Sequence, residues 1–173
     1  MSTIDSTLSQ NLQRIEVYAL GDRLGAPQFQ QAVNNSFIDY WFPYCIKYEV
    51  VISAFGKLHT TCPILAYMVD SQCSRWYEEM DTGNEEEMKL RSKLPHDFLV
   101  RVMIRYSQLV KDPSLKQLDR CSYHTHTSKK ERTNCKRKWE REGRDETENE
   151  DESEEGSEQG DEGEQDSEDE DGD

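Results

Sequence analysis

Apolar residues recur at steps of three and four along most of the chain, which is the period of α-helices that bury one face. The first such stripe runs from Leu8 to Leu24. Gly25 suits the position after a helix C-terminus, and Pro27 suits the first turn of a following helix. We therefore predict a second helix from about Pro27 to Tyr40, with a buried face formed by Phe29, Ala32, Val33, Phe37 and Ile38.

Three further helices are predicted. The segment Tyr48 to Phe55 is rich in β-branched residues, as a strand would be, but it also carries a helical stripe, and helices on both sides favour helix. Cys62 to Glu79 is a longer helix whose apolar stripe includes Trp76, and Asp81 to Glu87 is a solvated linker. The last helix begins at Leu94-Pro95 and ends before Pro113. Its predicted buried face comprises Phe98, Leu99, Val102, Met103, Tyr106 and Leu109.

The predicted fold class is therefore all-α, a small bundle of about five helices. Alternating strand patterns are nearly absent, and no βαβ rhythm is visible. No stretch approaches the roughly 18 consecutive apolar residues of a transmembrane helix. The N-terminus is polar, so we expect neither a signal peptide nor a membrane partner.

The net charge of −15 divides into three unequal parts. Residues 1–128 carry a net charge of −2, residues 129–144 carry +5, and residues 145–173 hold 18 acidic groups and no basic ones. A tail of acids, Ser and Gly cannot bury enough apolar surface to offset its chain entropy, so 145–173 is predicted to be a disordered acidic tail. The acidity of the whole chain therefore does not identify a partner for the folded part.

The chain has five cysteines, an odd number. Cys45, Cys62 and Cys73 stand among apolar residues, where a free thiol behaves as a small buried hydrophobe. We therefore expect no disulfides and an intracellular protein, in the cytoplasm or the nucleus.

Several segments, taken in order, resemble a known family. Residues 15–41 are similar to the C-terminal helix pair of a BTB/POZ domain, with Val17, Tyr18, Leu20, Gly21, Asp22 and Leu24 in its first helix pattern and Pro27, Phe29, Ala32 and Phe37 in its second. The later segments resemble the helices that follow the BTB domain in a group of filamentous-fungal proteins. These segments are Pro63 to Tyr77, Leu94 to Leu99, and the Cys-x-Tyr-His-x-His motif at Cys121, Tyr123, His124 and His126.

The resemblance implies a non-catalytic protein–protein interaction module with an unidentified protein partner. The strands that form the BTB sheet and dimer interface have no counterpart before Ile15, so the family's homodimer is not expected, whereas an exposed apolar patch is. The implied organisation is a flexible N-terminus (1–9), a BTB-like helix pair (10–44), a post-BTB helical region (45–120), a Cys/His segment with a basic linker (121–144) and the acidic tail (145–173).

The pattern Cys121-x2-His124-x-His126-x8-Cys135 is the sharpest cluster of chemically active residues. Thiolate and imidazole are zinc ligands, and four of them at short separations can close a tetrahedron. The spacing differs from that of a standard zinc finger. The alternative, which the sequence favours, is that Cys121 and Tyr123 pack the chain end onto the last helix while both histidines lie in solvent, with no cofactor.

No enzymatic activity is expected. Cys62 and His59 form the nearest nucleophile–base pair, but nothing in the sequence orients them and no Gly-rich oxyanion turn follows. Motifs of P-loop, dinucleotide-binding, zinc-protease and serine-hydrolase sites are absent from the sequence. We interpret His59 as a surface loop residue and His96 as a solvated residue of a first helical turn.

The basic run Lys129 to Arg144 supports a second hypothesis, a charge-driven nuclear binder of histones or nucleic acid that acts through this run and the acidic tail. Trp139 is available to stack on a base, and the basic pairs weakly match a nuclear-import signal. The simpler interpretation is a charged, partly helical extension beside a tethered acidic competitor. Nucleic-acid binding is therefore not favoured.

Overall fold

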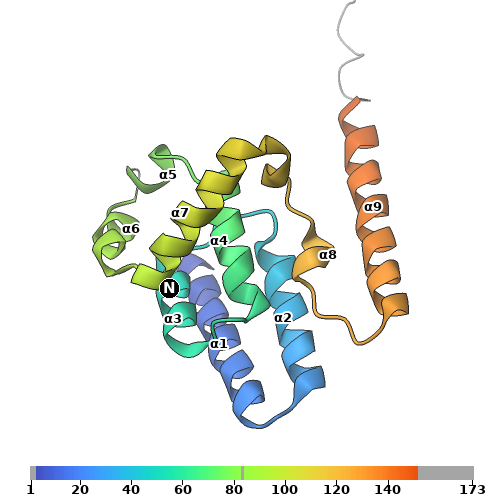
Figure 1. Cartoon of the computed structure of the whole chain (residues 1–173), viewed down its shortest axis with the longest axis horizontal. Coiled ribbons are helices and arrows are strands. Elements are labelled where there is room, and N and C mark those ends of the chain that lie inside the picture. The colour runs from blue at the N-terminus through green and yellow to red at the C-terminus, as the bar shows by residue number, and fades with distance from the viewer. Residues whose placement is uncertain (1–2, 83, 152–173) are drawn as a thin grey trace, which may run out of the picture. The chain divides into compact units, whose positions relative to one another are not determined.

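The computed structural model describes residues 3–82 and 84–151, and all regular structure within them is helical (Figure 1). This confirms the all-α fold class. In chain order the elements are α1 (Thr3–Arg23), α2 (Pro27–Trp41), α3 (Tyr48–Lys57), α4 (Pro63–Arg75), α5 (Glu79–Thr82), α6 (Glu85–Leu90), η1 (Arg91–Lys93), α7 (His96–Lys111), η2 (Pro113–Lys116), α8 (Arg120–Tyr123) and α9 (Lys129–Asp151), where η denotes a 3-10 helix. None of the described helices combines the length and the apolar character that crossing a bilayer requires.

The chain divides into two units, residues 1–136 and 137–173. Helix α9 begins in the first unit and continues in the second. The first residues of the predicted acidic tail, 145–151, belong to α9, and the rest of that tail lies outside the described residues. The core and the Cys/His segment lie in the first unit.

Helices α1 and α2 form a hairpin joined by a tight turn (Figure 1). Gly25 occupies the left-handed region with φ of 60°. Its N–H donates to the carbonyl of Asp22, and the N–H of Ala26 donates to the carbonyl of Gly21, which is the Schellman pattern of helix ends. Pro27 then stands in the first turn of α2, as predicted.

Helix α4 runs through the middle of the bundle, with α2, α3 and α7 around it (Figure 1). Its side chains Ile64, Leu65, Tyr67 and Met68 are fully buried. The hydroxyl of Tyr67 donates to the carbonyl of Trp41 at 2.7 Å, so the polar end of this buried ring is satisfied. The favoured helical interpretation of Tyr48 to Phe55 is confirmed by α3.

The buried face of α2 differs from the prediction. Phe29 is 44% exposed, whereas Asn34 is fully buried beside Phe37 and Ile38. The amide of Asn34 donates to the carbonyl of Tyr123 in α8 at 2.9 Å. Helix α8 therefore covers the polar residue Asn34 of α2. Phe29, at the start of the predicted apolar face, stays at the surface.

Two predicted boundaries were wrong. Helix α4 ends at Arg75, and Trp76 is extended and 41% exposed. The predicted linker 81–87 contains the start of α6, because the Asn84 side chain accepts hydrogen bonds from the N–H groups of Glu86 and Glu87. Acidic residues in the first turn also stabilise the helix through its dipole.

Only part of the predicted face of α7 is buried. Phe98 and Leu109 are 1% and 8% exposed, but Leu99, Met103 and Tyr106 are 42%, 71% and 60% exposed. The apolar surface of α7 is wider than the strip that α4 covers. The remaining apolar strip faces away from the core.

Candidate functional site

The one-turn helix α8 positions the first half of the Cys/His segment. The carboxylate of Asp119 caps this helix by accepting the N–H of Cys121 at 3.0 Å. Cys121 points inward and is 3% exposed. The chain leaves the helix in an extended conformation at His124, with φ of −74° and ψ of 142°.

Helix α8 and the segment after it are held against α2 by amide side chains. Asn34 donates to the carbonyl of Tyr123 at 2.9 Å. Asn35 pairs with the backbone of Thr125 in both directions: it accepts from the N–H at 2.9 Å and donates to the carbonyl at 3.2 Å. These contacts fix the backbone on both sides of His124.

Three of the four predicted ligand residues, Cys121, His126 and Cys135, come together in the first unit, and His124 adjoins them through Cys135. The Sγ of Cys121 lies 3.3 Å from Nε2 of His126, and the Sγ of Cys135 lies 3.1 Å from Nδ1 of His124. One ligand atom each of Cys121, His126 and Cys135 lie within 4.8 Å of one another. The rings of His124 and His126 meet edge to face with centroids 6.1 Å apart.

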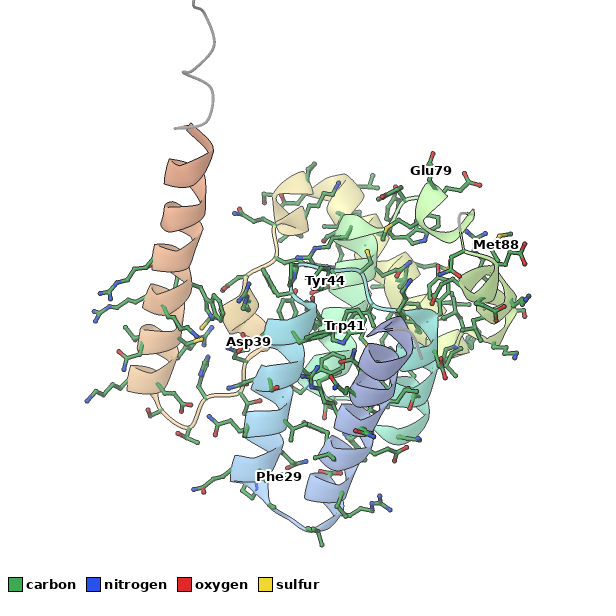
Figure 2. All side chains as sticks on the ribbon, turned by 180° about the vertical axis from the view of Figure 1, so that it is seen from behind. Phe29, Asp39, Trp41, Tyr44, Glu79 and Met88 are labelled. Carbon is green, nitrogen blue, oxygen red and sulfur yellow. The ribbon has the colours of Figure 1, made fainter. Side chains whose placement is uncertain are left out.

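The environment of His124 determines which of its nitrogens faces the cluster. Its Nε2 lies 3.0 Å from Oδ1 of Asp39, on the side of α2 that faces α8 (Figure 2). Burial lowers the pKa of His124, although Asp39 opposes the shift. With Nε2 beside Asp39, the nitrogen that faces the Sγ of Cys135 is Nδ1.

The prediction that both histidines lie in solvent was wrong, because the side chain of His124 is only 4% exposed and His126 is half-buried. Tyr123 also packs differently from the predicted contact with the last helix, because its ring meets Tyr67 of α4 edge to face at 5.2 Å. Asp39, Asn34 and Asn35 were not among the predicted site residues. No sequence signal pointed to them, since they stand some 90 positions before the segment they hold.

The other nucleophile–base pair considered from the sequence is not assembled. Nδ1 of His59 lies 2.9 Å from the hydroxyl of Thr61, and His59 is exposed as predicted. Cys62 is 5% exposed and hydrogen-bonds Tyr18. Burial raises the pKa of its thiol, so the thiolate that attacks substrates is disfavoured.

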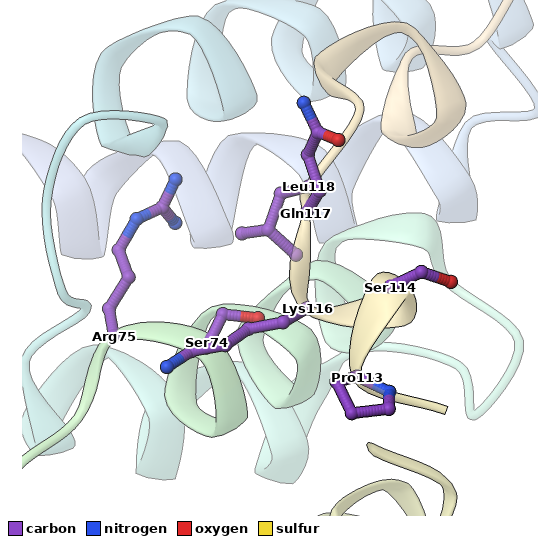
Figure 3. A pocket seen from close by; sticks show the side chains of 7 residues that line it. All are labelled: Ser74, Arg75, Pro113, Ser114, Lys116, Gln117 and Leu118. Carbon is purple, nitrogen blue, oxygen red and sulfur yellow. The ribbon is translucent and has the colours of Figure 1, made fainter. Parts of the chain in front are cut away.

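A shallow cleft lies between the end of α4 and η2 (Figure 3). Its lining includes the cationic side chains of Arg75 and Lys116 together with two serines and Pro113. The guanidinium of Arg75 also stacks over the ring of Phe42, 5.1 Å from its centroid. No carboxylate, Cys or His lines this cleft, so its lining offers no acid–base pair.

A second surface of interest is the uncovered strip of α7, which we call the outer seam and define as Leu99, Met103, Tyr106 and Val110. These side chains are 42%, 71%, 60% and 70% exposed. They follow one another at steps of four, three and four residues, so they form one row along the helix. The outer seam lies on α7, in the predicted post-BTB region, and is therefore a different surface from the patch expected on the BTB-like helix pair.

Comparison of the chain with protein-family models, with curated proteins and with solved structures finds no match. The similarity to the BTB/POZ helices therefore stays a prediction that rests on the residues quoted above.

Proposed function

We propose that this chain is a non-catalytic protein-interaction module that binds an amphipathic helix of another protein along the outer seam. The observation that carries the proposal is the exposure of four apolar side chains in one row, each 42% to 71% accessible. Monomeric proteins rarely leave contiguous apolar surface of this kind uncovered unless it is used for binding.

The spacing of the outer seam selects a helix as its occupant. Steps of four, three and four residues are those of the a and d positions of a heptad, which pack against the same positions of a second helix. Burying one such side chain contributes about 1.5–3 kcal/mol. Four of them therefore supply enough apolar surface for a specific helix-on-helix contact.

Charge favours a different protein over a second copy of this chain. Helix α7 contains Arg101, Arg105 and Lys111, but Arg101 pairs with Asp97 and Arg105 pairs with Asp70, both on the side of α7 away from the outer seam. Lys111 follows Val110 at the end of the outer seam. A partner helix with acidic residues beside this end of its apolar row complements Lys111, whereas a parallel second copy of α7 would bring two Lys111 side chains together. The proposed partner is thus an acidic amphipathic helix.

The non-catalytic part of the proposal is supported by the state of the thiols in the core. Burial raises the pKa of Cys62 and raises that of Cys73 to about 11, so both stay protonated at neutral pH. All five cysteines are free, which agrees with a protein of a reducing, intracellular compartment.

The similarity to fungal BTB/POZ proteins belongs to the same proposal, because it implies an interaction role. The hairpin of α1 and α2, with its three-residue turn, agrees with the helix pair that the similarity implies for residues 10–44. The proposed binding surface itself lies on α7, in the region that would follow such a pair.

The test uses two synthetic helices, each labelled with a fluorophore. Both carry Leu at the a and d positions, one has Glu at the flanking positions, and the other has Lys. Fluorescence anisotropy with the full chain should show tighter binding of the Glu peptide. Met103→Glu should weaken that binding about tenfold or more, since it removes one buried apolar side chain.

The matched control is Gln108→Glu, which adds the same charge to the same helix. Gln108 is exposed and points away from the outer seam, because residues five positions apart are rotated far from one another on a helix. Its binding constant should be unchanged. Equal weakening by the two variants would overturn the proposal, as would dimerisation of the free chain, measured by ultracentrifugation, that Met103→Glu abolishes.

The salt dependence of binding distinguishes this proposal from the alternative function, charge-driven binding of histones or nucleic acid. Apolar docking should persist at 0.5 M salt, where the Debye length is only about 4 Å. Binding carried by the basic run and the acidic tail should be lost there. Loss of all peptide binding in high salt would favour the charge-driven function instead.

A further inference from the structure

We propose that Cys121, His124, His126 and Cys135 bind one Zn²⁺ ion that fastens the start of α9 to α8. The four side chains come from three short stretches: α8, the extended segment after it, and the first two turns of α9. They lie in one unit of the chain, and the inference is independent of the outer seam.

Three of the four ligand atoms already lie close enough to share an ion. One ligand atom each of Cys121, His126 and Cys135 lie within 4.8 Å of one another. With zinc–sulfur bonds near 2.3 Å and zinc–nitrogen bonds near 2.0–2.1 Å, a sulfur and a nitrogen ligand lie about 3.6 Å apart. The sulfur–nitrogen distances are 3.3 Å for Cys121 with His126 and 3.1 Å for Cys135 with His124, so His124 adjoins the group through Cys135 and would complete it by a small movement of its ring.

The orientation of the His124 ring fits a ligand role. Asp39 lies 3.0 Å from Nε2, and Nδ1, on the other side of the ring, faces Cys135. Zinc-binding histidines typically use their second nitrogen in this way, donating to a carboxylate that orients the ring. The guanidinium of Arg120 lies 3.9 Å from the same carboxylate and helps to hold it in place.

The donor set selects the metal. Two thiolates and two imidazoles in a tetrahedral arrangement suit zinc, whereas magnesium and calcium prefer oxygen ligands. A full set of four protein ligands leaves no open position for a substrate, so the role of the ion is structural.

The ion would strengthen an existing attachment of α9. The first turn of α9 contacts the rest of the unit through Glu131, which accepts hydrogen bonds from Thr127 and Gln31, and through the carbonyl of Arg132, which accepts from the Sγ of Cys121 at 3.5 Å. A zinc bridge from Cys135 to Cys121 would extend this anchorage by one turn. The basic run would then leave the domain from a fixed starting point.

The first measurement is the metal content of the full chain. The protein is purified with reductant and dialysed against buffer that contains trace zinc. Inductively coupled plasma mass spectrometry should then find one zinc ion per chain. Cys135→Ser should abolish this stoichiometric binding. The control Cys73→Ser makes the same change at a cysteine of α4 outside the cluster and should retain the metal.

Cobalt identifies the ligands, because the acidic tail also offers carboxylates. Co²⁺ added to the metal-free chain should produce visible tetrahedral bands and a sulfur-to-cobalt charge-transfer band. Carboxylate binding in the tail produces no charge-transfer band. His124→Ala should reduce the tetrahedral bands, and Asp39→Asn should weaken metal affinity about 10- to 100-fold.

A folding readout covers the case in which a variant is unstable. EDTA should lower the melting temperature of the wild-type chain and of Cys73→Ser, but leave that of Cys135→Ser unchanged. The proposal is overturned if the reduced chain retains no zinc and develops no charge-transfer band. It is also overturned if Cys73→Ser loses the metal as Cys135→Ser does while both variants keep their helical circular-dichroism signal.

Discussion

The hydroxyl of Tyr123 donates to Oδ2 of Asp70 at 2.6 Å and so joins α8 to the central helix α4. The other oxygen of Asp70 lies 2.7 Å from Nε of Arg105 in α7. Burial, with the Asp70 carboxylate beside it, raises the pKa of Tyr123, so the hydroxyl remains a donor. One carboxylate thus connects three helices.

Tyr123→Phe tests this connection. The change removes one hydrogen bond to a charged group and keeps the ring, so we expect the free energy of unfolding to fall by about 1–3 kcal/mol. Urea denaturation measures this as a lower midpoint with an unchanged slope. The control Tyr106→Phe alters a hydroxyl on a residue that is 60% exposed and should change stability by less than about 0.5 kcal/mol.

Asn34→Ala tests the polar anchor between α2 and α8. The substitution leaves the carbonyl of Tyr123 without its amide donor and opens a small cavity at a fully buried position. We expect a loss of about 1–3 kcal/mol in the free energy of unfolding. Ser36→Ala, at an exposed position of the same helix, is the matched control. Equal stability of both variants would contradict the assigned role of Asn34.

Two glycine substitutions should act with opposite sign. Gly25→Ala places a Cβ on a residue with φ of 60° and should destabilise the chain by about 1–2 kcal/mol. Gly56 lies inside α3, where an added Cβ meets nothing within 4 Å. Gly56→Ala should therefore stabilise the chain by about 0.5–1 kcal/mol, because alanine loses less backbone entropy in a helix. Thermal unfolding of both variants measures these two changes as a lower melting temperature for Gly25→Ala and a higher one for Gly56→Ala.

Cys73 should react slowly with alkylating reagents in the folded chain. Burial raises the pKa of its thiol to about 11, and the Sγ donates to the carbonyl of Val102 at 3.6 Å. At pH 8 the thiolate fraction is then about two orders of magnitude below that of an unfolded chain. Iodoacetamide labelling followed by peptide mass spectrometry, with and without urea, measures the ratio. Equal rates in both conditions would show that the thiol is ionised in the fold.

The same shift predicts a pH dependence of stability. The folded pKa of Cys73 is raised above the unfolded value of about 8.5, so the folded chain holds this proton more tightly. Its contribution to stability is complete below pH 8.5 and is lost as the pH rises toward 11. Comparing urea midpoints at pH 8 and 10 should show a smaller decline for Cys73→Ala than for the wild-type chain.

Local signals in the sequence were enough to locate the main helices. Gly25 and Pro27 marked the turn between α1 and α2 because each satisfies a backbone requirement that depends on its neighbours alone. Pro95 and Pro113 likewise bounded α7. The capping amide of Asn84, which starts α6, is also a local signal, but the surrounding charges led to the prediction of a linker there.

The spacing of the Cys/His segment was enough to predict a cluster of possible metal ligands. It was not enough to predict which of these side chains are buried. Four ligand-type residues stood close together in the sequence, yet whether His124 faced water or the interior depended on Asp39, Asn34 and Asn35 in α2. Contacts between residues so far apart along the chain leave no mark on local periodicity.

The sequence by itself determined where the helices of this protein form and which residue types stand together near Cys121. Only the tertiary structure decided which helix faces are covered. Burial depends on which neighbour packs against a face, so Asn34 is enclosed by α8 while Met103, on an equally apolar helix, remains 71% exposed. An apolar stripe indicates that a helix face can be buried. The packing of elements that are distant in the sequence determines whether that face is buried.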